Sequence, residues 1–219
     1  ASFVDSFSIS SQEADPSGLA FNADGTKMFV VGRTDARDVN EYTLTTGFDV
    51  STASFVDSFD ISSQEIAPCG LKFNADGSKM FLVGTAGDDV NEYTLSTAFD
   101  VSTASFVDSF SVSSQETQPQ DLAFNVDGTK MFVMGAVGDD VNEYTLTTGF
   151  DVSTASFVGS FDISSQEIGA HSLTFNNDGT KMFVVGQYGD DVNEYTLSTG
   201  FDVSTASFVD SFDISSQEI

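Results

Sequence analysis

The sequence contains few residues of several kinds, and each scarcity excludes a class of protein. A single cysteine, Cys69, rules out an intrachain disulfide. A single histidine, His171, rules out a catalytic metal site built from several imidazoles. Lys and Arg number 7 against 34 Asp and Glu, a formal net charge of −27, which is the wrong sign for nucleic acids or anionic membranes. No apolar run reaches the roughly 18 residues of a membrane-spanning helix. We therefore expect no nucleic-acid partner and no membrane partner.

The chain is rich instead in phenylalanine and in internal repetition. It has 22 Phe and no Trp, and Phe recurs at fixed spacing, which indicates packing rather than chemistry. The tetrapeptide Ala-Ser-Phe-Val begins at Ala1, Ala53, Ala104, Ala155 and Ala206. A period of about 51 residues fits one blade of a β-propeller better than any helical repeat. The predicted organisation is a single domain, 1–219, with a strand at 1–11, repeats at 12–62, 63–113, 114–164 and 165–215, and a tail at 216–219.

Each repeat predicts four antiparallel strands and no helix. In the unit that begins at Ala53, residues 54–62 alternate between apolar and polar, residues 71–74 and 79–84 flank an Asp-Gly hairpin turn, and residues 90–95 form a further strand. Residues 63–70 contain Pro68 and Gly70 and are predicted to be a loop. Sheets of this kind pack face to face around an axis. The predicted fold is therefore an all-β propeller of four-stranded antiparallel blades.

The two ends of the chain leave the closure of the ring open. Residues 2–10 and 207–215 have nearly the same sequence and compete for one outer-strand position. Three arrangements follow. The chain closes alone as four blades with one strand spare, two chains share blades or strands as a homodimer, or the chain belongs to a larger ring.

The pattern Pro-x-Gly-Leu-x-Phe-Asn-x-Asp-Gly-[Thr/Ser]-Lys-Met-Phe, seen in 16–29 and 68–81, resembles the blade repeats of YVTN-type and lactonase-like bacterial β-propellers. The resemblance implies that residues 19–22 and their copies form the innermost strands. The Val-Asn-Glu-Tyr segment departs from the YVTN pattern. The whole unit also resembles tandem propeller-like repeats of marine bacteria and phages, whose function is unknown.

The four copies differ most in two loops, which in a meander emerge on the same face of the ring. One loop precedes the inner strand (14–18, 66–70, 117–121, 168–172), and the other follows the second strand (33–37, 85–86, 136–137, 187–188). Loops held by a rigid scaffold often carry binding sites. Arg33 and Arg37 are the only basic residues in these loops and are candidate anchors for an anionic or carboxylate group. The candidate ligand-binding residues of this variable face are Ser17, Arg33, Arg37, Cys69, Gln120, His171 and Tyr188.

Catalytic and metal chemistry find little support in the sequence. Cys69 and His171 could face each other as a nucleophile pair, but no third orienting group is identifiable. The Asn-x-Asp-Gly turns lack most calcium ligands, and the Asp-Asp loops are typical of solvated turns. The glutamates of the Ser-Ser-Gln-Glu segments could ring the channel mouth and favour a cation there. We expect no catalytic residue, no metal ligand and no cofactor, with calcium at the acidic loops as the alternative.

The sequence thus predicts a non-catalytic binding or structural module whose variable face meets a protein or carbohydrate ligand. One alternative is a lactonase-like propeller hydrolase with a cation at the central channel, and another is a purely structural repeat protein. An extracellular or particle-surface location is favoured because the strong negative charge suits high ionic strength.

Overall fold

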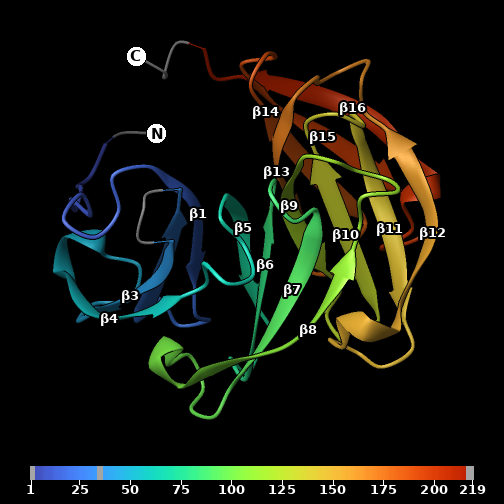
Figure 1. The fold of residues 1–219 in the computed structure, drawn as a ribbon. Coiled ribbons are helices and arrows are strands. Elements are labelled where there is room, and N and C mark those ends of the chain that lie inside the picture. Colours follow the sequence, from blue (N-terminus) through green and yellow to red (C-terminus); the bar gives the residue numbers. More distant parts are fainter. Residues whose placement is uncertain (1–2, 34–36, 216–219) are drawn as a thin grey trace.

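The protein is an all-β propeller of four blades, each a four-stranded antiparallel sheet (Figure 1). The computed structural model describes residues 3–33 and 37–215. Within that part of the chain, no helix is long and apolar enough to cross a membrane. The strands of each sheet follow chain order, so every blade is a simple meander. The first strand of each blade is the innermost, as the resemblance implies, because these strands pack on one another from blade to blade.

The strand bounds repeat closely from blade to blade. Blade 1 consists of β1 (Pro16–Phe21), β2 (Lys27–Gly32), β3 (Asp38–Leu44) and β4 (Ala53–Asp60). Blade 2 consists of β5 (Pro68–Phe73), β6 (Lys79–Gly84), β7 (Asp89–Leu95) and β8 (Ala104–Ser111). Blade 3 consists of β9 (Pro119–Phe124), β10 (Lys130–Gly135), β11 (Asp140–Leu146) and β12 (Ala155–Asp162). Blade 4 consists of β13 (Ala170–Phe175), β14 (Lys181–Gly186), β15 (Asp191–Leu197) and β16 (Ala206–Asp213). One turn of 3-10 helix precedes each outer strand: η1 (Val50–Thr52), η2 (Val101–Thr103), η3 (Val152–Thr154) and η4 (Val203–Thr205).

The Asp-Gly turns form the predicted hairpins. In blade 2, Oδ1 of Asn74 accepts the Lys79 N–H at 2.9 Å, and Oδ1 of Asp76 accepts the Ser78 N–H at 2.9 Å. Gly77 has a φ of 72°, which only glycine adopts without cost. These side chains are bound within the turn, so hairpin formation explains why the segment is repeated so faithfully.

The inner strands begin earlier than predicted. The interpretation of residues 63–70 as loop was wrong at its end, because β5 starts at Pro68 and pairs with β6 from Gly84. A register shift lies between Pro68 and Gly70, where the strand is irregular. Pairing with the neighbouring strand therefore outweighs the local tendency of proline and glycine to end a strand.

Apolar side chains from neighbouring blades form one core cluster at each junction. Between blades 1 and 2, the fully buried side chains of Phe29, Val31 and Val39 pack with Leu71 and Leu82. The other two junctions repeat this arrangement with the corresponding residues. Phenylalanine is thus a packing residue, as its regular spacing predicted.

The four blades form an open arc. Strand β1 packs on β5, β5 on β9 and β9 on β13, but no comparable contact between β13 and β1 is found in the described residues. Figure 1 shows blade 1 (blue) and blade 4 (orange to red) at the two ends of the arc. Closure of this chain on itself as four blades, one of the three predicted arrangements, is therefore not seen.

The strand predicted at 1–11 is also not seen, although residues 1–2 lie outside the described part. Residues 3–9 belong to no strand. The outer position of blade 4 is already filled by β16, which pairs with β15 from Asp213 to Ala206. The N-terminal segment instead packs on blade 1, where the rings of Phe7 and Tyr42 meet edge to face at 5.7 Å.

Candidate functional site

The two variable loops of each blade lie side by side. In blade 2, the Thr85 N–H donates to the carbonyl of Ala67 at 3.1 Å. The same bond joins Arg33 to Asp15 in blade 1, and its counterparts recur in blades 3 and 4. The structure therefore brings the variable segments together on one face, around the beginnings of the four inner strands.

Five of the candidate residues meet at one end of the channel. A cavity of about 280 Å³ there is lined by the candidate residues Ser17, Arg33, Cys69, Gln120 and His171. We call these five residues the channel mouth. Four of them come from the same column of the repeats, one per blade, so the blades themselves bring the column together. The fifth, Arg33, follows β2 and belongs to the second variable loop.

Arg33 connects three blades at the channel mouth. Its Nη2 atom lies 2.7 Å from Sγ of Cys69 in blade 2 and 3.3 Å from Oε1 of Gln120 in blade 3. Both acceptors are uncharged, and no carboxylate of the described residues pairs with this guanidinium. Arg33 therefore brings a positive charge and a planar set of donors to the channel mouth, although Asp15 also lines the cavity and the protein is strongly negative.

The thiol of Cys69 is poorly suited to act as a nucleophile. Burial raises its pKa above the ordinary value, and the nearby Arg33 guanidinium opposes only part of that rise. Its Sγ donates to the Ala67 carbonyl at 3.5 Å, and no hydrogen bond to His171 is found in the described residues. The thiol is therefore protonated at neutral pH, which is the unreactive form.

Asp121, which is not among the predicted candidates, lies beneath the channel mouth. Asp121 is only 4% exposed. The Lys72 ammonium lies 3.1 Å from Oδ1, while Oδ2 accepts the Ser172 hydroxyl and the Leu173 N–H, each at 3.0 Å. Asp121 thus ties blade 3 to blades 2 and 4. The sequence does mark Asp121 as unusual, because the other repeats carry Gly or Ser at the equivalent position.

Two predicted candidates lie away from the channel mouth. Arg37 donates from Nε to the carbonyl of Ile66 at 3.1 Å, on an exposed part of the loop. Tyr188 is 66% exposed and its ring lies over Gly169. Neither residue lines the channel-mouth cavity.

The possible ring of carboxylates at the channel mouth is not formed by the glutamates that the structure describes. Glu65 is 1% exposed, and its carboxylate accepts the backbone N–H groups of Ala67, Ala86 and Gly87. Glu116 and Glu167 hold the corresponding loops in the same way. The glutamate of each Ser-Ser-Gln-Glu segment therefore stabilises the two variable loops rather than facing the channel.

The acidic loops, as far as the structure describes them, hold no arrangement of ligands that suits a metal. Among the described residues, no group of three or more His, Cys, Asp or Glu side chains is placed to hold an ion. Oδ1 of Asp139 accepts the Gly169 N–H at 3.0 Å. Its counterpart Asp88 has a raised carboxyl pKa, first because of burial and then because Asp89 and two glutamates repel the charge.

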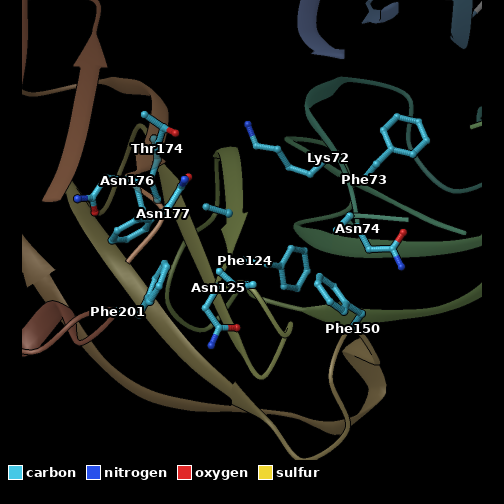
Figure 2. A pocket seen from close by; sticks show the side chains of 15 residues that line it. Lys72, Phe73, Asn74, Phe124, Asn125, Phe150, Thr174, Asn176, Asn177 and Phe201 are labelled. Atoms are coloured by element: carbon cyan, nitrogen blue, oxygen red, sulfur yellow. The ribbon is translucent and has the colours of Figure 1, made fainter. Parts of the chain in front are cut away.

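A second opening lies on the opposite face, between blades 2, 3 and 4. Figure 2 shows this cavity of about 420 Å³, with Phe124, Phe150 and Phe201 on its wall and the amides of Asn74 and Asn125 nearby. The amides bind their own hairpin turns, and the rings pack at the blade junctions. This cavity combines repeated scaffold residues with side chains that differ between the blades, since Lys72, Thr174 and Asn177 also line it.

No protein-family model and no curated protein matches the sequence. Solved structures match in fold. A functionally unknown protein from Desulfotomaculum acetoxidans aligns with a TM-score of 0.63 at 14% identity, over 90% of this chain and 56% of its own length. A candidate 6-phosphogluconolactonase from Bacteroides uniformis aligns at 0.61 and 13% identity, over 91% and 57%. The periplasmic gluconolactonase of Pseudomonas aeruginosa aligns at 0.55 and 15% identity, over 90% and 53%.

Such low identities show a shared fold and nothing more. The chain spans slightly more than half the length of each of these structures. The likeness agrees with the predicted resemblance to lactonase-like propellers. The resemblance to repeats of marine bacteria and phages stays a prediction.

Proposed function

We propose that this propeller is a non-catalytic binding module whose channel mouth binds a carboxylate-bearing ligand, such as a carbohydrate acid. The observation that carries the proposal is the position of Arg33, whose guanidinium reaches the channel between Cys69 and Gln120. A guanidinium pairs with a carboxylate through two parallel hydrogen bonds. Gln120, Ser17 and His171 supply further polar groups for a ligand's hydroxyls.

The negative charge of the protein makes this site selective among anions and opposes nonspecific anion binding. With a net charge of −27, the protein repels anions except where a local positive group lies close to them. We expect weak binding that is sensitive to ionic strength. For such a module we propose the extracellular or particle-surface setting that the sequence favours.

The test compares charged and neutral sugars of the same shape. Calorimetry or saturation-transfer NMR would measure binding of glucuronate and galacturonate against glucose and galactose. We expect the acids to bind and the neutral sugars to bind at least ten-fold more weakly. Arg33→Gln should abolish the preference for the acid, and Arg33→Lys should keep only part of it because the planar fork is lost. Arg37→Gln is the matched control, since it removes the same charge away from the channel mouth.

Two results would contradict this proposal. One is equal binding of acids by the Arg33→Gln variant, and the other is the absence of binding by every acid in the panel. The second outcome would favour a purely structural repeat.

A lactonase-like hydrolase is the second candidate, favoured by the names of two structural neighbours. Hydrolysis of gluconolactone with and without millimolar calcium, at fixed ionic strength, tests it directly. Calcium-dependent turnover that disappears with Asp121→Asn or His171→Ala would support hydrolysis. A melting temperature and a hydrolysis rate that calcium leaves unchanged would remove the metal-dependent form of this candidate.

A further inference from the structure

Blade 4 ends the arc with a face that every other blade buries. In blade 1 this leading face consists of Phe29, Val31, Val39 and Phe59. In blade 4 the same columns hold Phe183, Val185, Val192 and Phe212. The first three columns are fully buried in blades 1 to 3 by the blade that follows. In blade 4 they are only half-buried, and Phe212 is 69% exposed. The apolar surface that holds the other blades together is therefore uncovered here.

Blade 1 begins the arc with the complementary face. Leu19 is 57% exposed, whereas its counterparts in the other three blades are at most 1% exposed. Phe48 is 61% exposed, while the corresponding rings of the later blades pack against the blade before them. An apolar groove of about 310 Å³ runs between Ile9, Leu19 and Val30. In the interior junctions, the leading face of the preceding blade packs against these columns.

The polar groups at the two ends are complementary as well. At the junction of blades 1 and 2, Nζ of Lys27 donates to the Phe99 carbonyl at 2.6 Å, and Oε2 of Glu41 accepts the Val101 N–H at 3.0 Å. The next two junctions repeat both bonds. In blade 4, the side chains of Lys181 and Glu194 bond only to each other among the described residues.

Blade 1 carries the missing partners of that pair. The Phe48 carbonyl and the Val50 N–H occupy the columns of Phe99 and Val101. The two open ends therefore match in shape, in apolar character and in hydrogen-bonding groups. This chain of four blades also covers slightly more than half the length of the structurally similar propellers. A second copy would therefore supply about as much chain as a closed ring still needs.

We propose that two copies of this chain close one ring, with blade 4 of each copy docked on blade 1 of the other. The two junctions are head-to-tail, and the two-fold symmetric ring leaves no open end. Each junction has the composition of the interior junctions, which already hold within one chain. Because each chain carries a charge of −27, salt should strengthen the association by screening repulsion.

In the single chain, residues 3–9 cover part of the open end at blade 1. At the interior junctions the ring of the preceding outer strand, such as Phe59, meets the tyrosine of the next blade, such as Tyr93, edge to face at 5.7 Å. Phe7 makes this same contact with Tyr42. In the closed ring, Phe212 of the other copy takes this place, because β16 is a paired strand and residues 3–9 are not. Docking therefore displaces residues 3–9.

Molar mass in solution tests the proposal directly. Light scattering across a range of protein concentrations at 0.5 M NaCl should give the mass of two chains. Phe183→Asp and Leu19→Asp each place a charge at one end and should each give the mass of one chain. Val158→Asp is the matched control, because Val158 is 55% exposed on an outer strand of an interior blade, and it should leave two chains. Far-ultraviolet circular dichroism would show that the variants remain folded, as expected for residues already in contact with solvent.

A mixture of the two end variants separates this arrangement from other dimers. When Phe183→Asp is mixed with Leu19→Asp, one junction carries both charges and the other carries none. A two-chain species should reappear, held by the single intact junction and dissociating more readily than the wild-type ring. A symmetric face-to-face dimer or a nonspecific association would not be restored in this way.

Several outcomes would overturn the proposal. These are a single-chain mass at all concentrations, a mass that grows beyond two chains, two-chain mass in both end variants, or no restoration on mixing. Phe7→Ser tests the displacement step. It should lower the dissociation constant several-fold, and an increase would show that residues 3–9 remain in the ring.

Discussion

Glu41 is held between its own blade and the next one. Its Oε1 atom lies 2.6 Å from the Lys27 ammonium, and its Oε2 atom accepts the Val101 N–H of blade 2. The glutamate side chain is 2% exposed, so both interactions lie in a medium of low polarity. The Val-Asn-Glu-Tyr strand, which departs from the YVTN pattern, thus supplies a polar tie between blades.

Removing this tie at an interior junction should destabilise the protein far more than removing it at the open end. In blade 2, Glu92→Gln replaces a carboxylate that accepts from Lys79 and from the Val152 N–H. An amide offers one acceptor instead of two and leaves the ammonium without its counter-charge. We expect a loss of about 2–4 kcal/mol in the free energy of unfolding, measured by denaturant titration.

Glu194→Gln is the control, because Glu194 is 29% exposed and bonds only to Lys181 among the described residues. In this variant the free energy of unfolding should fall by less than about 1 kcal/mol. Both variants are best measured in the Leu19→Asp background, where the proposed ring cannot form. Equal losses would show that the contact with the next blade contributes nothing.

The four-stranded blade could be predicted because the residues that determine its strands and turns lie close together in the sequence. Each hairpin turn holds its own bonds, as Asn74 and Asp76 do, and the alternation of apolar residues marks the strands around it. The start of the inner strand could not be predicted from Pro68 and Gly70, because its pairing with Gly84 depends on the folded sheet. The open arc could not be predicted either, since no single repeat encodes the angle between blades.

The candidate site could be predicted only in part. Comparison of the repeats identified the column of Ser17 and His171, because a ring of blades brings equivalent positions together. The contact of Arg33 with Gln120 spans 87 positions in the sequence and depends on the curvature of the arc. The binding of Glu65 to the second variable loop could not be predicted, because these partners lie more than 20 positions further along the chain.

The turn glycines should be intolerant of even one methyl group. An ideal Cβ on Gly77 would lie 2.1 Å from Cδ2 of Phe99, and the φ of this residue is 72°. Gly77→Ala therefore combines backbone strain with a clash against a ring that is packed at the blade junction. We expect a loss of about 2–4 kcal/mol in the free energy of unfolding.

Gly159→Ala provides the comparison, since nothing lies within 4 Å of its added Cβ. Gly159 stands in β12, where alanine is easier to order than glycine. Stability should stay the same or increase by up to about 1 kcal/mol. A similar loss in both variants would contradict the role given to the turn.

The charge on Asp88 should destabilise the protein at neutral pH. Burial raises its carboxyl pKa, with further repulsion from Asp89, Glu65 and Glu116. A raised pKa means that the neutral form stabilises the fold below about pH 4, and that this contribution is lost as the pH rises through the folded pKa. Asp88→Asn, which is neutral throughout, should therefore raise the free energy of unfolding at pH 7 but not at pH 3.

Asp139→Asn is the matched control for this prediction. Both positions have a positive φ, 54° and 48°, which asparagine tolerates. The amide oxygen at 139 can still accept the Gly169 N–H, so its stability should change little at either pH. Destabilisation by Asp88→Asn at pH 7 would show that the carboxylate makes a favourable contact.

The contact between Arg33 and Cys69 should be visible in the titration of the thiol. Cys69 is the only cysteine, so alkylation by iodoacetamide, followed by mass spectrometry, reports on this one group. The guanidinium favours the thiolate and thereby opposes the rise in pKa that burial causes. Arg33→Gln should therefore move the midpoint of the pH–rate profile to higher pH, whereas Arg37→Gln should leave it in place. The midpoint is the quantity to compare, because the absolute rate also depends on how far the side chain at 33 covers the sulfur. An unchanged midpoint would mean that the contact between Arg33 and Cys69 does not persist in solution. The observation that supports the proposed carboxylate site would then be lost.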